Sequence, residues 1–213
     1  MTADAHAIRT VEQLLDVLDL DSTQARTTED IFTGSSHPMP SGRIYGGQVL
    51  AQSLLAAERT LPEDRAVHSM HGYFLRPGDA SQGITIAVDR IHDGRSFSTR
   101  RSQAYQNGVP IFSMIASFQD DDPGIEHAVP MPEGIPGPDS LLPDEQRVDG
   151  LPPGVVRMLS DRAADVRHID SPMFLPSADS RVPQQGVWMR MKAPLPDDPV
   201  SYTHLTLPTT PYV

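Results

Sequence analysis

An apolar helical segment followed at once by four strand-forming segments is the feature that most constrains this fold. Residues 46–61 place apolar side chains on nearly every side of an expected helix, which ends at Pro62, and such a helix is usually enclosed by other structure. Segments with strand composition follow at 67–75, 84–88, 96–106 and 109–119. Asp93-Gly94 and Asn107-Gly108 predict two-residue hairpins, because these dipeptides supply the positive φ angles that such turns need. The order predicts an α+β domain in which an antiparallel sheet wraps round one long central helix.

Weaker patterns flank this region on both sides. Residues 8–20 carry apolar side chains at helical spacing and predict an amphipathic helix, and residues 28–35 predict a first strand. Eight prolines fall within the 31 residues from Pro123 to Pro153, which predicts an extended linker. Two further strand patterns, at 164–169 and 185–192, predict the start of a second unit similar to the first. We therefore expect a first domain at 8–121, a linker at 122–155 and an incomplete second unit at 156–199.

The last residues differ in composition from everything before them. Residues 201–213 contain no Asp, Glu, Lys or Arg, and four of them are Thr. The run from Val200 to Thr210 resembles the translation of a transposase adapter used in sequencing libraries, and such scars are excluded from fold reasoning. We therefore expect residues 200–213 to be non-native. The alternative is a genuine Thr-rich tail, which an uninterrupted natural reading frame through Tyr202 and Pro211 would establish.

Composition excludes several classes of partner and site. The formal net charge of −11 repels a nucleic-acid duplex, and no basic stripe compensates for it. The chain has no Cys, so disulfides, thiolate metal sites and a Cys nucleophile are excluded. The N-terminus lacks the basic and apolar regions of a signal peptide, and no apolar stretch approaches the roughly 18 residues of a membrane span. We expect a cytoplasmic protein without nucleic-acid or membrane partners.

The sequence gives little support for the common catalytic, metal-binding and nucleotide-binding motifs. Gly94-Arg95-Ser96-Phe97-Ser98 is a near miss for a nucleophile elbow, but its fifth position is Ser and it lies in an expected hairpin. His68 and His71 are three residues apart, which places them on opposite faces of a strand and argues against a shared metal ion. Neither GxxxxGK[ST] nor GxGxxG occurs, so the usual nucleotide sites are not predicted.

Three positions remain as candidates for binding or chemistry. Gly46 and Gly47 leave the backbone N–H groups at the helix start accessible, which suits an anion or a polarised carbonyl; alternatively the glycines only permit a tight turn. His68 could act on a bound thioester as a general base or hydrogen-bond donor, although a strand histidine is more often structural. Arg100 belongs to a cluster of arginines that could hold a small anion, and a solvated strand face is the commoner explanation.

Several ordered motifs resemble the N-terminal half of type II acyl-CoA thioesterases, which are double-hotdog hydrolases. The resemblance covers residues 8–198 and is strongest over 44–131. The segments that carry it are Ile44 to Gln48, Val67 to Asp79, Gly94 to Arg101, Phe112 to Gln119 and Gly124 to His127. It implies a hotdog fold, complete in the first unit and partial in the second. It further implies hydrolysis of acyl-CoA to fatty acid and CoA, without a metal or an organic cofactor, by a homo-oligomer in the full-length protein.

The resemblance also bears on the site residues. Given the resemblance, we expect Gly46, Gly47 and Gln48 at the helix start, and Arg100, to contact the acyl-CoA substrate, while the sequence leaves open which of Arg76, Arg100 and Arg101 meets the CoA phosphates. The catalytic Asp, Thr and Gln of the family are expected in the second hotdog, beyond the end of this chain, so none is assigned here and His68 is the remaining catalytic candidate. One alternative is a non-catalytic acyl-CoA-binding hotdog or interaction module. A hotdog dehydratase is another, but its paired Asp and His in an Asn-rich helix start are not found.

Overall fold

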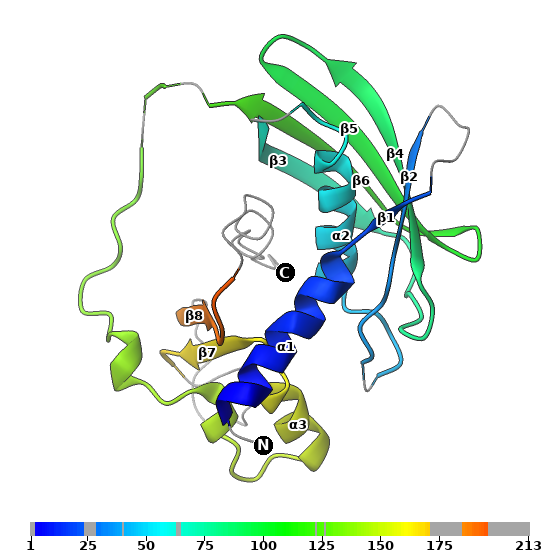
Figure 1. The fold of residues 1–213 in the computed structure, drawn as a ribbon. Coiled ribbons are helices and arrows are strands. Elements are labelled where there is room, and N and C mark those ends of the chain that lie inside the picture. The colour runs from blue at the N-terminus through cyan, green and yellow to red at the C-terminus, as the bar shows by residue number, and fades with distance from the viewer. Residues whose placement is uncertain are drawn as a thin grey trace. The chain divides into compact units, whose positions relative to one another are not determined.

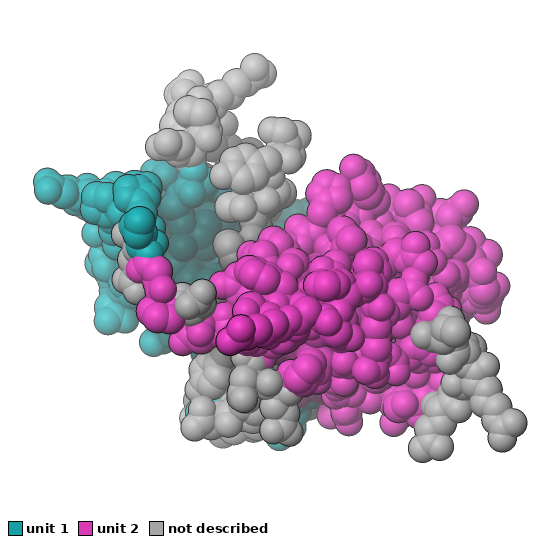
Figure 2. Space-filling view, turned by 90° about the horizontal axis from the view of Figure 1, so that it is seen from above, with its two compact units in different colours: residues 1–12, 125–195 teal, residues 13–124, 196–213 magenta. Residues whose placement is uncertain are grey.

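The computed structural model describes residues 3–23, 29–39, 41–62, 65–121, 123–125, 127–170 and 185–195. The chain forms two compact units, shown in different colours in Figure 2. The larger unit contains Gln13–Gly124, and the smaller contains Ile125–Leu195 together with the N-terminal residues up to Glu12. The predicted non-native segment, residues 200–213, lies outside the described residues.

The larger unit is an antiparallel sheet wrapped round one helix (Figure 1). The helix is α2, Gly46–Glu58. The strands are β1 (Asp21–Ser22), β2 (Asp30–Gly34), β3 (Arg65–Phe74), β4 (Ile84–Asp93), β5 (Phe97–Gln106) and β6 (Val109–Asp120). Their order in the sheet is β1-β2-β4-β5-β6-β3, and every neighbouring pair is antiparallel. This topology confirms the predicted α+β hotdog arrangement.

The core lies between α2 and the sheet face that packs on it, which we call the inner face. The middle of α2, Leu54 to Ala57, is completely or almost completely buried, as the apolar composition of the helix predicts. Alternate residues of the strands supply the other side of the core, among them Ile86 and Val88 on β4 and Phe112 and Phe118 on β6. Because successive strand residues point to opposite faces, the residues between them form an outer face that turns away from α2.

The helices depart from their predicted bounds at both ends of the domain. Helix α1 spans Ala3–Leu18. It therefore begins earlier than the predicted residue 8 and ends earlier than the predicted residue 20. Helix α2 starts at the predicted Gly46 but ends at Glu58, because the chain tightens there into a turn in which the Thr60 N–H donates to the Ala57 carbonyl. None of the helices in the described ranges is long and apolar enough to cross a membrane.

The two predicted hairpins have different outcomes. Asn107 and Gly108 have φ angles of 50° and 74°, which confirms the predicted two-residue turn between β5 and β6. The predicted hairpin between β4 and β5 is confirmed, but its turn is not Asp93-Gly94, because β4 continues through Asp93 and three residues separate it from β5. Asp93 stays paired with Ser98, whose hydroxyl donates to the Asp93 carboxylate at 2.9 Å. This side-chain contact joins the two strands where the turn, residues 94–96, begins and ends.

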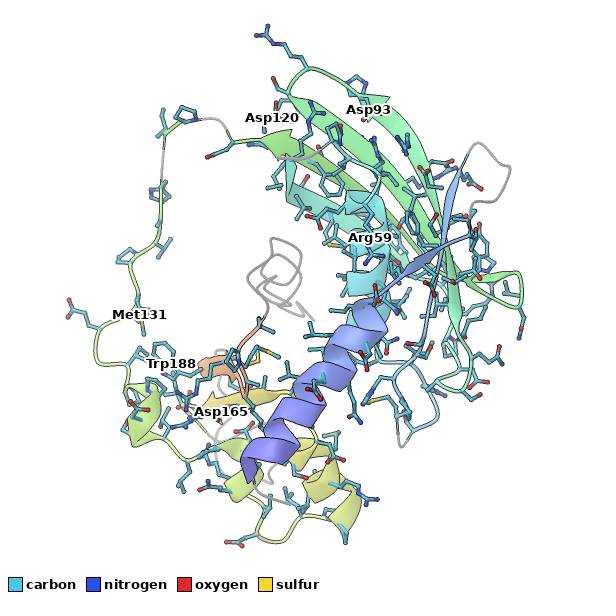
Figure 3. The ribbon with its side chains drawn as sticks, in the orientation of Figure 1. Arg59, Asp93, Asp120, Met131, Asp165 and Trp188 are labelled. Carbon is cyan, nitrogen blue, oxygen red and sulfur yellow. The ribbon has the colours of Figure 1, made fainter. Side chains whose placement is uncertain are left out.

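The smaller unit contains a two-stranded antiparallel sheet, β7 (Ala164–His168) with β8 (Val187–Met191). Both strands fall where the sequence predicts them. Helix α3, Pro153–Ser160, was not predicted, and the short 3₁₀ turns Pro138–Ser140 and Asp144–Gln146 lie in the segment predicted to be extended. The Trp188 indole N–H donates to the Pro136 carbonyl at 3.0 Å and fixes this segment to β8; Trp188 and Asp165 are labelled in Figure 3.

Candidate functional site

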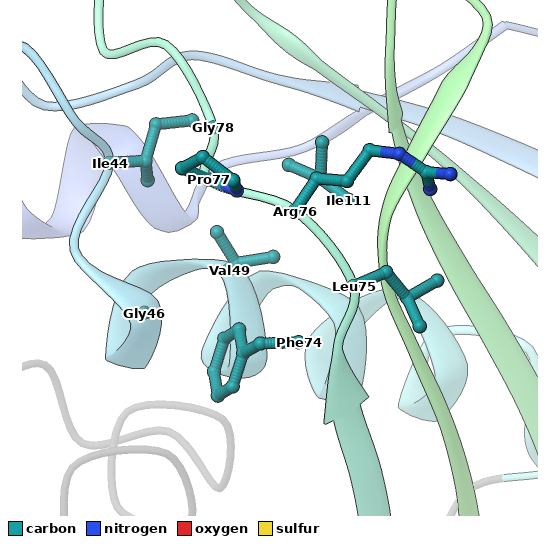
Figure 4. Close-up of a pocket in the computed structure, with 9 residues that line it drawn as sticks. All are labelled: Ile44, Gly46, Val49, Phe74, Leu75, Arg76, Pro77, Gly78 and Ile111. Carbon is teal, nitrogen blue, oxygen red and sulfur yellow. The ribbon is translucent and has the colours of Figure 1, made fainter.

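A pocket of about 300 Å³ lies beside the first turn of α2. Ile44, Gly46 and Val49 form the side that belongs to the helix and the segment before it. Residues 74–78, at the end of β3 and in the following loop, form the opposite side, and Ile111 of β6 completes it. Figure 4 shows Val49 and Phe74 close together between α2 and the loop. A concave, mostly apolar cavity of this size is typical of small-molecule sites.

Backbone hydrogen bonds fix the loop that forms the far wall. The Ile44 N–H donates to the Gly78 carbonyl at 3.0 Å, and the Ala80 N–H donates to the Gly42 carbonyl at 3.0 Å. The Gln106 side chain, which is buried, accepts from the Asp79 N–H at 2.8 Å. These contacts tie the loop to the segment before α2 and to the end of β5. The pocket is therefore formed in the protein before any ligand binds.

The glycines at the helix start bring two aromatic rings close to the backbone. A Cβ on Gly46 would lie 3.1 Å from the Phe74 ring, and a Cβ on Gly47 would lie 2.5 Å from the Tyr45 ring. Tyr45 and Phe74 remain 61% and 58% exposed, so both rings also face solvent. The glycines therefore also permit the close approach of these two rings to the helix start.

The start of α2 offers donors beside an apolar cavity. The Gly46 and Gly47 N–H groups occupy the first two helical positions, where no intrahelical acceptor exists. The helix macrodipole adds partial positive charge at the same place. No acidic residue lies in the first turn to compete for these donors. The arrangement can polarise a carbonyl oxygen while an attached apolar group enters the pocket.

Gln48 was predicted to contact substrate, but its amide serves the protein. The residue is buried, and its Oε1 accepts from the His37 N–H at 3.0 Å. Its Nε2 donates to the Ser35 carbonyl at 3.1 Å and to Gln52 Oε1 at 3.2 Å. All of these partners hold the segment after β2 against α2. The geometry supports a structural role and does not support the predicted contact with substrate.

Arg100 is also committed to internal contacts. Its side chain is fully buried on the inner face, at the C-terminal end of α2. The guanidinium donates to Thr60 Oγ1 at 2.7 Å, to Asp93 Oδ1 at 2.6 Å, and to the Thr60, His92 and Thr99 carbonyls. The Arg100 hydrogen bond, with help from Ser98, holds the pKa of the Asp93 carboxyl below its ordinary value. An arginine enclosed in this way supports the fold and has no exposed surface for a CoA phosphate.

His68 lies at a bulge in β3, on the outer face of the sheet. Its Nε2 is 2.8 Å from the Ser117 hydroxyl, and Ser117 lies between the buried Ala116 and Phe118, so it points away from α2. The imidazole also packs edge-on against Phe97. The structure therefore does not bring His68 to Gly46 and Gly47, and it does not support the predicted action of His68 on a thioester at the helix start.

The pocket contains residues that the sequence did not single out. Phe74 and Gly78 belong to a recognised motif, but their position in a cavity wall depends on long-range packing. Arg76 has the only ionisable side chain among the described residues that line the pocket. Its Nη1 donates to the Pro110 carbonyl at 2.9 Å. Among the described residues, no group of three or more His, Asp or Glu side chains could hold a metal ion.

Comparisons with known proteins match the segment that builds this pocket. The acyl-CoA thioesterase N-terminal domain matches residues 35–119. Acyl-coenzyme A thioesterase 8 of Homo sapiens is 42% identical over 122 residues, which are 57% of this chain and 38% of that protein. The solved tesB protein of Mycobacterium avium subs paratuberculosis has a TM-score of 0.71 and 31% identity, over 92% of this chain and 67% of its own. Acyl-CoA thioesterase II TesB2 of Mycobacterium marinum has a TM-score of 0.61 and 37% identity, over 90% and 64%.

The chain belongs to the type II acyl-CoA thioesterase family. It spans 38% of the length of the human relative. The range that matches the acyl-CoA thioesterase domain, 35–119, includes all residues that line the pocket. Strands β7 and β8 of the smaller unit lie outside that range. The pocket beside α2 is therefore the candidate functional site of this type II acyl-CoA thioesterase chain.

Proposed function

We propose that this chain binds acyl-CoA as part of an enzyme that hydrolyses the thioester to a free fatty acid and CoA. The observation that carries the proposal is the apolar pocket placed against the N–H groups of Gly46 and Gly47, which have no acceptor within the helix. An acyl thioester has the matching parts, since it joins a polar carbonyl to an apolar chain. The names of the family and of the relatives add support, because they describe acyl-CoA thioesterases.

The carbonyl oxygen of the thioester would accept hydrogen bonds from the start of α2. Attack by water places negative charge on that oxygen, and donors already in position stabilise this charge without reorganisation. The Tyr45 and Phe74 rings flank the same place. The helix start would thus serve as an oxyanion site.

The group that activates water is to be sought outside the pocket lining. Arg76 is the only ionisable side chain among the described lining residues, and a guanidinium offers hydrogen-bond donors but no acceptor for a proton from water. His68 points to the outer face of the sheet. The proposal for this chain therefore assigns it binding of the substrate and polarisation of the carbonyl, and leaves proton transfer to other residues of the full-length protein.

Release of CoA and binding of acyl-CoA can be measured separately with this chain. A thiol reagent reports released CoA alone, because the protein contains no Cys. We expect decanoyl-CoA to bind more tightly than CoA itself, as measured by calorimetry. Binding without thiol release would assign only the binding role to this chain and favour a non-catalytic acyl-CoA-binding module. Absence of binding for every acyl-CoA tested would refute the proposal.

Three broader expectations belong to the same proposal. We propose that the protein acts in fatty acid metabolism, that it is cytoplasmic, and that the full-length form is a homo-oligomer. Support for self-association comes from β3, which lies at one edge of the sheet. It is 10 residues long and contains neither Pro nor Lys, the residues that commonly protect such an edge from pairing with another strand. Analytical ultracentrifugation of the full-length protein tests this last expectation.

A further inference from the structure

We propose that Gln52 is a positioning residue, which holds the start of α2 so that the N–H groups of Gly46 and Gly47 meet the thioester carbonyl. This inference rests on the proposed function, because it takes that carbonyl to lie at Gly46 and Gly47. Gln52 does not line the pocket. It acts through Gln48, which lies one turn earlier on the same helix and accepts no other route to the core of the domain than this amide contact and the segment after β2.

Gln52 is a polar residue in the interior of the domain. Its exposure is 0%, and burial of an amide is costly unless its hydrogen-bonding groups are paired. Its nitrogen and its oxygen both have partners: Nε2 donates to the Val17 carbonyl at 2.6 Å and to the Ser35 carbonyl at 2.9 Å, and Oε1 accepts from Gln48 Nε2 at 3.2 Å. One side chain therefore joins α2 to the end of α1 and to the segment after β2.

The backbone leaves room for this side chain at Gly34, the last residue of β2. A Cβ on Gly34 would lie 2.7 Å from Gln52 Nε2 and 2.6 Å from Cδ2 of Leu20. Both distances are shorter than real Cβ contacts, so a side chain at this position would displace the amide or its apolar neighbour. The end of β2 is thus built to fit the Gln52 amide.

The start of α2 needs an anchor that leaves its donors open. Tyr45 occupies the cap position, and its side chain does not cap the first N–H groups. Helix ends fray readily, and the first N–H groups have no partner within the helix. A capping side chain would fix this end, but it would also occupy donors that a substrate carbonyl needs.

The two glutamine amides provide such an anchor. Gln48 belongs to the first turn, and its side chain binds the His37 N–H and the Ser35 carbonyl, which lie outside the helix. Gln52 holds the Gln48 amide from the next turn and is itself held by the Val17 carbonyl. The first turn is therefore fixed through side chains that leave its backbone donors available.

A pair of ligands isolates the contact that Gln52 is proposed to support. Decanoyl-CoA and S-decyl-CoA differ only at the thioester carbonyl, which a methylene replaces in the second. Calorimetric titration with each, below its micelle concentration, gives the preference for the carbonyl as a ratio of affinities. For the unchanged chain we expect decanoyl-CoA to bind about tenfold more tightly, because only its carbonyl accepts hydrogen bonds from Gly46 and Gly47.

Gln52→Met keeps the length of the side chain and removes its hydrogen bonds. The helix start then loses its anchor, so the preference for decanoyl-CoA should fall to about threefold or less, while the affinity for S-decyl-CoA stays the same. Thr60→Val is the matched control, because it also removes buried hydrogen bonds, but at the other end of α2. It should keep the preference of the unchanged chain.

Gln48→Met makes the same test if Gln52→Met does not fold, which a thermal melt shows. It leaves the contacts of Gln52 with Val17 and Ser35 in place and removes the anchor in the first turn. The preference for decanoyl-CoA should again fall to about threefold or less.

Three results would overturn the proposal, and one of them also reaches the proposed function. If the folded glutamine variants keep the full preference, or if they weaken both ligands equally, Gln52 supports the fold alone and the proposed function stands. If the unchanged chain binds decanoyl-CoA and S-decyl-CoA equally well, the carbonyl contact at Gly46 and Gly47 fails, and the positioning role fails with it. Loss of the preference in the glutamine variants, with the preference retained in Thr60→Val, supports the inference.

Discussion

The two ends of α2 meet the rest of the domain in different ways. At the C-terminal end, the buried Arg100 guanidinium connects the Thr60 hydroxyl, the Asp93 carboxylate and the His92 carbonyl. Arg59, labelled in Figure 3, adds a hydrogen bond from the same end to the Leu20 carbonyl. At the N-terminal end, the helix start has two glycines, two exposed aromatic rings and an apolar pocket.

This difference separates the part of the helix that holds the fold from the part that can bind a ligand. The C-terminal end of a helix carries partial negative charge, and Arg100 supplies the complementary positive charge inside the protein. The N-terminal end carries partial positive charge, and no acidic residue of its first turn neutralises it. We call the C-terminal end, which the Arg100 contacts hold, the fixed end, and the N-terminal end beside the pocket the open end. The fixed end holds the helix in position, so a ligand that binds at the open end need not order the helix first.

The largest effect is expected from removing the charge at the fixed end. Arg100→Met keeps much of the side-chain volume but leaves the buried hydroxyl and carbonyl of Thr60, and the partly buried carbonyl of His92, without their donor. Each buried hydrogen-bonding group left without a partner typically costs about 1 to 3 kcal/mol, so we expect the free energy of unfolding to fall by about 3 kcal/mol. Urea unfolding followed by circular dichroism measures this change.

Arg101→Met is the matched control for that variant. Arg101 is the next residue along β5, but its side chain is 55% exposed on the outer face and pairs with Asp89. Loss of an exposed pair changes the free energy of unfolding by no more than about 1 kcal/mol. Equal losses of stability for Arg100→Met and Arg101→Met would contradict the view that the buried contacts fix this end of α2.

A second variant tests the Thr60 hydroxyl at the fixed end. Thr60→Val is nearly isosteric, and it removes the hydroxyl that accepts from Arg100 Nε at 2.7 Å and donates to the Ala57 carbonyl at 2.7 Å. A buried donor is left unpaired, so we expect a loss of about 2 kcal/mol in the free energy of unfolding. Ser53→Ala is the control: the Ser53 hydroxyl oxygen is also buried, but it has no hydrogen-bond partner within the described part of the chain. Ser53→Ala should be neutral or stabilising, and a comparable loss there would show that burial alone, and not the hydrogen bond, matters.

The third prediction concerns the open end. Gly46→Leu places a side chain against the Phe74 ring, at the mouth of the pocket. We expect decanoyl-CoA affinity to fall about tenfold, which corresponds to about 1.4 kcal/mol. The free energy of unfolding should change little, because leucine favours the helix more than glycine does and offsets the crowding.

Gly137→Leu provides the comparison for Gly46→Leu, since nothing lies within 4 Å of the corresponding Cβ. It should leave decanoyl-CoA affinity unchanged. Should Gly46→Leu lower stability by as much as Arg100→Met while affinity stays the same, the assignment of binding to one end and stability to the other would have to be abandoned.

The sequence predicts the open end of the helix better than the fixed end. Gly46 and Gly47 were recognised as a helix start, because glycine and the change of hydrophobic periodicity are local signals. Arg100 was interpreted as a ligand contact, since nothing local indicates that a strand arginine will be fully buried against Thr60. The pocket itself depends on Gly78 and Ile111, which are brought to Val49 by long-range packing.

The hairpins and His68 illustrate the same limit. The Asn107-Gly108 turn is correctly predicted because its conformation depends only on the two residues within it. The Asp93-Gly94 turn is not, since the Asp93 carboxylate is held by Arg100 and Ser98 from the neighbouring strand. Whether His68 faces α2 depends on the bulge at that point in β3, and a bulge changes the alternation from which faces are assigned.

The smallest effect is expected from acid acting on Asp93. The hydrogen bond from Arg100, followed by the one from Ser98, lowers the pKa of the Asp93 carboxyl in the folded protein. A carboxyl whose folded pKa lies below its unfolded pKa, about 3.9, contributes stability above that pH and loses it as pH falls through the folded pKa. The free energy of unfolding should therefore decrease on going from pH 7 to pH 3, and Asp93→Asn should show a smaller decrease than the unchanged chain.

Because half of the Asp93 side chain is exposed, at 49%, solvent screens the contribution and the difference should be modest. Urea unfolding at the two pH values measures it. An identical decrease in both proteins would mean that ionisation of Asp93 does not contribute to the free energy of unfolding. The fixed end would then depend on the contacts of Arg100 with Thr60 and the backbone carbonyls alone.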